Sequence, residues 1–217
     1  MIYKDLLFIH LPKTGGNSFQ KNLYLNGGYK GSLSAHGKQD LTNRFDVTDK
    51  FTKSKHQTLF EYDKICNIND FKVVTILREP TYRLLSLYFS PYDNLVFRNY
   101  AFKLLSKFIK SKPMFFFKRK KNQFNLDKFI NLINSADTMS DFLKINGKVY
   151  KNLNILKFEN YNADVEKFFK SNNLTYFKIK INKSIFDYNY DELIKIHNLK
   201  EVVKNTKHLE DYINFNY

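Results

Sequence analysis

The amino-acid sequence predicts an α/β fold, in which a P-loop-like parallel sheet is flanked by helices. Two short apolar runs, at residues 6–9 and 73–77, are each followed by a polar turn and then by a helical pattern. Repeated strand-loop-helix units favour parallel strands. Residues 94–148 have a basic, aromatic and helical pattern, which predicts a helical insertion. With 217 residues and 43% hydrophobic composition, we expect one domain spanning residues 1–217.

The first strand-loop-helix unit lies at the N-terminus. Residues 6–9 (LLFI) form a continuous apolar run, which is typical of a buried strand. A proline and two glycines follow at residues 12–16 and indicate a loop. A helical pattern then begins at Ser18 and extends to about Leu25.

The second unit repeats this order. Residues 73–77 (VVTIL) are rich in β-branched side chains, Pro80 ends the strand, and residues 84–88 resume a helical pattern. Farther along, the pattern predicts a strand at 155–158, a helix at 164–170, a half-buried strand at 176–181 and a helical remainder at 190–208.

Composition limits the partners and the compartment. The formal charge of +15 and the pI of about 9.6 should attract polyanions. A single cysteine, Cys66, excludes an internal disulfide framework. No apolar stretch reaches membrane length, but residues 114–117 (MFFF), bracketed by lysines, could touch a membrane surface without crossing it. We expect a cytoplasmic protein with this one peripheral contact.

Residues 10–18 (HLPKTGGNS) are suited to holding an anion between a strand and a helix. Glycines let backbone N–H groups turn inward, and the N-terminus of the following helix adds partial positive charge. The side chains of Thr14, Asn17 and Ser18 supply further donors, and Lys13 supplies a full charge. The segment therefore predicts a phosphate-binding loop.

The order of residues in this loop argues against a nucleoside triphosphatase. An ATP or GTP loop has its lysine after the glycines, with a hydroxyl beside it for magnesium. Here Lys13 precedes Gly15 and Gly16. We expect Lys13 to lie near the group that is transferred.

A second anion-binding element follows the strand at 73–77. The guanidinium of Arg78 can bind two oxygens of a phosphate at the strand end. Ser86 can donate a hydrogen bond to the same phosphate from the helix. For Arg83 an ion pair on its own helix is the more ordinary role. Two phosphate sites on adjacent units suit a nucleotide that is phosphorylated at two places.

The pair of segments LPKTGGNSF (11–19) and REPTYRLLSLY (78–88) resembles the two elements with which sulfotransferases bind 3'-phosphoadenosine-5'-phosphosulfate (PAPS). The resemblance is to the carbohydrate branch, which includes heparan sulfate 2-O-sulfotransferase and small bacterial sulfotransferases. Three later segments extend it: LKFENY (156–161), INKS (181–184) and DYINFNY (211–217). It does not cover residues 92–148, and Glu79 departs from the family's more frequent Asp or Asn.

The resemblance implies a metal-free transfer of a sulfuryl group from PAPS to a hydroxyl of a carbohydrate or glycolipid, with adenosine 3',5'-bisphosphate as the leaving product. Lys13 would neutralise the departing oxygen, while Arg78 and Ser86 would bind the 3'-phosphate. Lys183 would close over the phosphates, unless it is simply solvated. The 5'-phosphosulfate would be held by Thr14, Gly15, Gly16, Asn17, Ser18 and Phe19.

A hydroxyl needs a base, and histidine is well suited to this near neutral pH. His56 lies upstream of Arg78 at the spacing that the family's base shows, so the resemblance implies that His56 is the base. His36 is the reserve, and a carboxylate such as Glu61 is the third candidate.

The remaining candidates have ordinary interpretations. We expect His10 to be packed at the strand end, and His197 and His208 to be solvated on helices. Glu159 is expected to orient a basic group or to cap the helix that follows it.

Two other functions compete with sulfuryl transfer. A P-loop kinase or NTPase would share the strand-loop-helix but lacks support from the residue order. A nucleic-acid or anionic-surface binding module would suit the net charge and the basic aromatic residues 102–124. We expect no nucleic-acid partner, and the acceptor itself is not readable: tyrosine peptides and small alcohols stay open beside carbohydrates.

Overall fold

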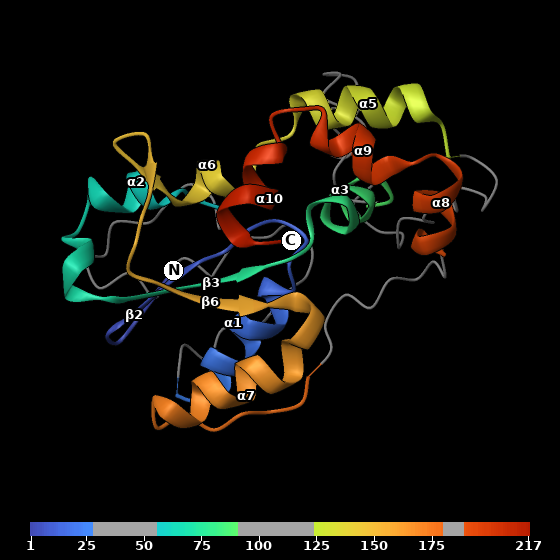
Figure 1. Cartoon of the computed structure of the whole chain (residues 1–217). Coiled ribbons are helices and arrows are strands. Elements are labelled where there is room, and N and C mark those ends of the chain that lie inside the picture. The colour runs from blue at the N-terminus through green and yellow to red at the C-terminus, as the bar shows by residue number, and fades with distance from the viewer. Residues whose placement is uncertain (28–55, 91–123, 180–188) are drawn as a thin grey trace, which may run out of the picture. The chain divides into compact units, whose positions relative to one another are not determined.

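A computed structural model describes residues 1–27, 56–90, 124–179 and 189–217 (Figure 1). The chain divides into two compact units. The first unit draws on residues 1–79, 137–187 and 209–217, and the second on residues 80–136 and 188–208. Within the described ranges, no helix is long and apolar enough to span a bilayer.

The first unit is built on a four-stranded sheet with the order β1-β2-β3-β6. Its strands are β1 (Ile2–Tyr3), β2 (Leu6–Ile9), β3 (Lys72–Leu77) and β6 (Leu153–Lys157). Strands β2, β3 and β6 run parallel, and the short β1 pairs antiparallel with β2. The predicted parallel α/β sheet is confirmed, and its strands begin or end within a few residues of the expected positions.

Helices cover both faces of this sheet (Figure 1). Alternate residues of β2 point to opposite faces, which is the period of a strand. Phe8 packs with Phe19 of α1 (Gly16–Leu25) and Phe169 of α7 (Tyr161–Ser171). Ile9 belongs to the core on the other face, under α2 (Leu59–Asp63), α6 (Met139–Leu143) and α10 (Leu209–Phe215). Each such buried side chain contributes roughly 1.5–3 kcal/mol.

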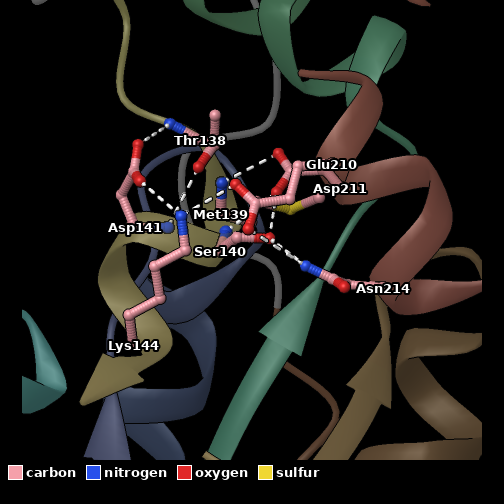
Figure 2. A network of polar contacts seen from close by, with 8 residues as sticks. All are labelled: Thr138, Met139, Ser140, Asp141, Lys144, Glu210, Asp211 and Asn214. Carbon is pink, nitrogen blue, oxygen red and sulfur yellow. Dashed lines mark hydrogen bonds and ion pairs between the residues drawn. The ribbon is translucent and has the colours of Figure 1, made fainter. Parts of the chain in front are cut away.

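The C-terminal helix α10 is tied to α6 by a polar network (Figure 2). The buried carboxylate of Asp211 accepts hydrogen bonds from the main-chain N–H groups of Met139 and Ser140, both at 2.8 Å. It also accepts the hydroxyl of Ser140 at 2.9 Å. The first N–H groups of a helix have no partner within it, so Asp211 satisfies two of those of α6. Beside it, Lys144 pairs with Glu210 at 2.8 Å.

The second unit is helical. It contains α3 (Pro80–Tyr88), α5 (Leu126–Ser135), α8 (Tyr190–Ile196) and α9 (Leu199–Lys204). Aromatic rings hold it together; for example, Tyr88 meets Phe129 edge-on at 5.7 Å and Phe89 stacks on Tyr190 at 5.9 Å. The expectation that His208 is solvated is wrong, because His208 is fully buried and its Nε2 lies 3.0 Å from the carbonyl oxygen of Ile133.

Part of the helical insertion expected at 94–148 lies outside the described residues. In its described part, α5 and α6 are followed by two short strands, β4 (Lys144–Ile145) and β5 (Lys148–Val149), which pair antiparallel. The missed signal is Asn146-Gly147, whose φ angles of 51° and 76° make the tight turn that an Asn-Gly pair favours.

The half-buried strand expected at 176–181 is not formed over its described residues 176–179. The side chains of Asn22 on α1 and of Asn26, the C-cap of α1, bind backbone groups of this segment. Asn22 accepts the N–H of Phe177 at 2.7 Å, and Asn26 accepts the N–H of Thr175 at 2.7 Å. Asn26 also donates to the carbonyl of Thr175 at 2.8 Å. The alternating pattern therefore reflects packing against a helix.

Candidate active site

The carboxyl ends of β2, β3 and β6 lie at one edge of the sheet, because the three strands are parallel. The loop at residues 10–15 follows β2, Arg78 and Glu79 follow β3, and the short 3-10 helix η4 (Phe158–Asn160) follows β6. In open α/β sheets this edge is where ligands bind. The predicted phosphate loop and Arg78 therefore meet at the expected edge.

Two threonine side chains fix the main chain where β2 enters the loop. The hydroxyl of Thr75 on β3 donates to the carbonyl of Ile9 at 3.0 Å, and the hydroxyl of Thr14 donates to the carbonyl of Leu11 at 3.0 Å. Both threonines are fully buried. The direction of the peptide groups around His10 is thereby set from both sides.

His56 lies against this strand end. Its Nδ1 is 2.8 Å from the carbonyl oxygen of His10, and the two imidazole rings meet edge-on with centroids 4.6 Å apart. His56 is half-buried, whereas His10 is only 4% exposed, as expected for a packed histidine. The candidate base and the start of the phosphate loop are thus in direct contact.

The loop itself adopts a left-handed backbone at two positions. Lys13 has a φ of 68° and Gly15 a φ of 86°, and the second is the N-cap of α1. No cap side chain bonds to the helix there, and Gly15 instead accepts the N–H of Ser18 at 3.0 Å through its carbonyl. A helix N-terminus of this kind offers N–H groups and positive potential to an anion.

Close approach requires glycine at position 16, and Gly15 combines a close approach with its left-handed backbone angle. A Cβ at Gly16 would lie 2.1 Å from the ring of His10, and a Cβ at Gly15 would lie 3.1 Å from the rings of Phe158 and Tyr161. The first distance is impossible for a side chain. The loop is therefore packed between the His10 ring and the aromatic residues that follow β6.

Arg78 joins the two predicted phosphate-binding elements. Its Nη1 donates to the carbonyl of Lys13 at 3.3 Å, and its guanidinium lies 4.3 Å from the centroid of the Phe158 ring. A guanidinium presents five N–H donors in a flat fork, a geometry that suits two oxygens of a phosphate. The arrangement places the guanidinium of Arg78 against the main chain of Lys13, in the loop that precedes α1.

Glu79 and Glu159 have structural partners that the sequence did not indicate. The main-chain N–H of Glu79 donates to Glu159 at 2.8 Å, and the Glu79 carboxylate accepts the hydroxyl of Tyr212 at 2.5 Å. Glu159 was expected to orient a basic group or to cap the next helix. The helix is not capped by a side chain at Asn160, and Glu159 holds a main-chain group instead.

Several predicted positions have other roles or lie elsewhere. The ring of Phe19 is fully buried in the core, which removes its side chain from a ligand. Glu61 caps α2 through the N–H of Thr58 at 2.7 Å. Ser86 is half-buried on α3 in the second unit. His36 and Lys183 lie outside the described residues.

Two tyrosines near this edge were missed. Burial raises the pKa of Tyr161 well above its ordinary value, and its ring packs on Gly15. Burial also raises the pKa of Tyr217, and the carboxylates of Glu159 and Glu79 act in the same direction. Both phenols therefore stay protonated near neutral pH and are donors. They end two segments that the sequence analysis singled out, 156–161 and 211–217, but no sequence pattern predicts that their phenols are buried, because the residues that bury them become close only through the fold.

The grouped side chains favour an anionic ligand. Arg78 and Lys13 supply positive charge at the edge of the sheet, and α1 adds its N-terminal N–H groups. Among the described residues, no three His, Cys, Asp or Glu side chains are grouped as metal ligands would be.

Comparison with known proteins identifies the family. A family model described as the sulfotransferase family matches residues 3–146, which run from β1 to the turn after β4 and include the phosphate loop, His56 and Arg78. No curated protein and no solved structure matches the chain. Because the family match covers more than half of the 217 residues, the chain belongs to the sulfotransferase family.

Proposed function

We propose that this protein transfers a sulfuryl group from PAPS to a hydroxyl group of a carbohydrate or glycolipid, with His56 as the base. The observation that carries the proposal is the contact of His56 with His10, at 2.8 Å, at the start of the loop that bears Lys13. It brings a proton acceptor to the loop where an anionic donor would bind. The match to the sulfotransferase family supports the class of reaction.

The reaction is an in-line displacement at sulfur. The acceptor oxygen forms a bond to sulfur while the bond from sulfur to the 5'-phosphate oxygen breaks, and adenosine 3',5'-bisphosphate leaves. His56 takes the proton of the acceptor hydroxyl. Lys13 stabilises the negative charge that develops on the departing phosphate oxygen, a role that matters most in the transition state.

Binding of the donor is assigned to the loop and to Arg78. The main chain at residues 14–18 holds the 5'-phosphosulfate, with the side chains of Asn17 and Ser18 as further donors. Arg78 and Ser86 bind the 3'-phosphate, and Lys183 closes over the phosphates. The positive groups supply the counter-charge, so the proposal includes no metal.

The acceptor is assigned by chemistry and by resemblance to the carbohydrate branch. A net charge of +15 suits an anionic glycan or a glycolipid at an anionic surface. We further propose that the enzyme works in the cytoplasm, with a peripheral contact to a membrane that carries the acceptor. A panel of glycans, glycolipids, tyrosine peptides and small alcohols, tested with labelled PAPS, distinguishes these classes.

Calorimetry tests donor binding without knowledge of the acceptor. Adenosine 3',5'-bisphosphate should bind in the presence of a chelator, and more tightly than ATP or single-stranded DNA. Binding that needs added magnesium would favour the NTPase interpretation instead. A preference for single-stranded DNA would favour a nucleic-acid binding module.

Single-turnover sulfation tests the two assigned roles once the panel yields an acceptor. His56→Ala should keep nearly normal affinity for the bisphosphate and lose roughly 100-fold or more in rate, the usual scale of general-base catalysis. Lys13→Ala should lose turnover more than affinity. His36→Ala is the matched control and should retain most activity. If His56→Ala turns over like the wild type, the base is another residue.

A further inference from the structure

The hydrogen bond at Nδ1 of His56 determines which of its nitrogens can act as a base. The partner, 2.8 Å away, is the main-chain oxygen of His10, which can only accept. Nδ1 must therefore carry the proton. A neutral imidazole has one N–H, so the lone pair lies on Nε2.

We propose that His10 is a positioning residue: its carbonyl accepts Nδ1–H of His56, and its ring holds the His56 imidazole against that carbonyl, so that the Nδ1–H tautomer is fixed and Nε2 receives the acceptor's proton. The inference rests on the proposed role of His56 as the base. The tautomer itself follows from the contact alone and is measurable without donor or acceptor.

The carbonyl of His10 is well suited to this role because its neighbours are fixed. The carbonyl before it, on Ile9, accepts the hydroxyl of Thr75, and the carbonyl after it, on Leu11, accepts the hydroxyl of Thr14. Three successive carbonyls thus each meet a side-chain donor. A peptide group held in this way on both sides cannot rotate without breaking buried hydrogen bonds.

The ring of His10 adds a second constraint. It meets the His56 ring edge-on, with centroids 4.6 Å apart. On another side it occupies the space next to Gly16, where an added Cβ would lie only 2.1 Å from it. The His10 ring is therefore packed between the base and the first residue of α1. A shift of the phosphate loop would move the His10 ring, and with it the imidazole of His56.

This arrangement lets His56 accept a proton without rearranging. When Nε2 takes the proton of the acceptor, the ring becomes an imidazolium with N–H groups on both nitrogens. The bond from Nδ1–H to the His10 carbonyl is kept and becomes a charge-assisted bond, which is stronger. The base therefore keeps its orientation between the free and the protonated states.

The experiment is nitrogen-15 NMR of the full chain, labelled at histidine, at a pH at which the rings are neutral. His56→Gln assigns the His56 signals. We expect a protonated-type shift at Nδ1 of His56 and a lone-pair shift at Nε2. His208 is an internal reference for the other tautomer. Its Nε2 lies 3.0 Å from the carbonyl oxygen of Ile133, so that nitrogen must carry the proton.

A protonated Nε2 on His56, or shifts averaged between the two tautomers, would overturn the inference. Because neither PAPS nor an acceptor is present, this result is independent of the proposed function. A fixed Nδ1–H tautomer combined with wild-type turnover by His56→Ala would leave the tautomer standing and remove His56 as the base.

Two substitutions separate the ring of His10 from its carbonyl. His10→Phe keeps a ring of similar size, and it should preserve the Nδ1–H signal of His56. His10→Ala removes the ring, and it should give averaged shifts and a turnover at least about tenfold lower, with little change in bisphosphate affinity. Identical spectra and turnover for His10→Ala and the wild type would overturn the positioning role of the ring. Circular dichroism of both variants checks that they fold.

Discussion

Nη1 of Arg78 donates to the main-chain oxygen of Lys13 at 3.3 Å, so the residue after β3 holds the loop after β2. Lys13 needs this support, because its φ of 68° lies in the left-handed region, which is costly for a residue with a side chain. The same guanidinium rests on the ring of Phe158. Arg78 therefore stabilises the loop conformation in addition to its proposed contact with the 3'-phosphate.

We predict that Arg78→Ala weakens binding of adenosine 3',5'-bisphosphate by about 1.5–3 kcal/mol, the range of a charge-assisted hydrogen bond. Arg78→Lys should recover only part of the lost binding free energy. A lysine keeps the charge, but it lacks the paired N–H donors of a guanidinium and cannot stack flat on the Phe158 ring. Calorimetry measures both. Ser86→Ala, which removes a neutral donor, should have the smaller effect. Wild-type affinity in Arg78→Ala and Ser86→Ala would remove the proposed 3'-phosphate site.

The hydrogen bond between Tyr212 and Glu79 leads to a stability prediction. Both groups are buried, and the bond joins the C-terminal helix to the end of β3 at 2.5 Å. Tyr212→Phe should lower the free energy of unfolding by about 1–3 kcal/mol, because it takes a donor from a buried carboxylate. Denaturant unfolding measures the change.

Tyr150→Phe is the matched control for this prediction. It removes an exposed hydrogen bond from the Tyr150 hydroxyl to Asn69, at 3.2 Å. Its effect should be within about 0.5 kcal/mol, as for most surface changes. Equal losses in Tyr150→Phe and Tyr212→Phe would mean that the contact with Glu79 adds nothing beyond an ordinary surface bond.

A third prediction concerns Asp211 and the start of α6 (Figure 2). Its carboxylate is fully buried and accepts three hydrogen bonds, from Met139 and Ser140. Asp211→Ala should lower the free energy of unfolding by about 3 kcal/mol, since bonds to a charged group are worth more than neutral ones. Asp211→Asn should cost less, because an amide still offers one acceptor oxygen. Thermal and denaturant unfolding show which of the two variants loses more stability. A larger loss in Asp211→Asn than in Asp211→Ala would contradict the prediction.

The sheet and its helices could be predicted because they depend on local patterns. The runs at 6–9 and 73–77 are short and almost continuously apolar, as is typical of buried parallel strands, and turn residues follow each of them. The phosphate loop was predictable for the same reason, since its glycines and Lys13 are consecutive. Arg78 was found from its position after a strand.

The side-chain contacts between distant segments could not be predicted. Glu79 and Tyr212 are 133 residues apart, and Ser140 and Asp211 are 71 apart, with no pattern in the sequence that links them. The strand expected at 176–181 failed for a related reason. Its alternation is real, but the N–H of Phe177 bonds the side chain of Asn22 on α1, and the N–H of Thr175, just before the segment, bonds Asn26 at the end of that helix.

The last prediction concerns the acid stability of the capping box at α6. The carboxylate of Asp141 accepts the N–H of Thr138 at 3.0 Å and lies 3.2 Å from the ammonium of Lys144. Burial acts to raise the pKa of Asp141, but the hydrogen bonds from Thr138 and Lys144 outweigh it and hold the pKa below its ordinary value of 3.8. The ionised form is thus favoured in the folded state.

The sign of the pH effect follows from this direction. A carboxyl group with a lowered pKa in the folded state stabilises the protein above its unfolded pKa, and the contribution is lost as the pH falls through the folded pKa. Asp141→Asn should therefore be less stable than the wild type at neutral pH, and the difference should disappear as the pH falls through the folded pKa of Asp141. The side chain is 41% exposed, so solvent screening limits the difference to about 0.2–1 kcal/mol. Denaturant unfolding of both proteins from neutral to acidic pH measures this difference in the free energy of unfolding. A difference that persists in acid would mean that the substitution acts through packing.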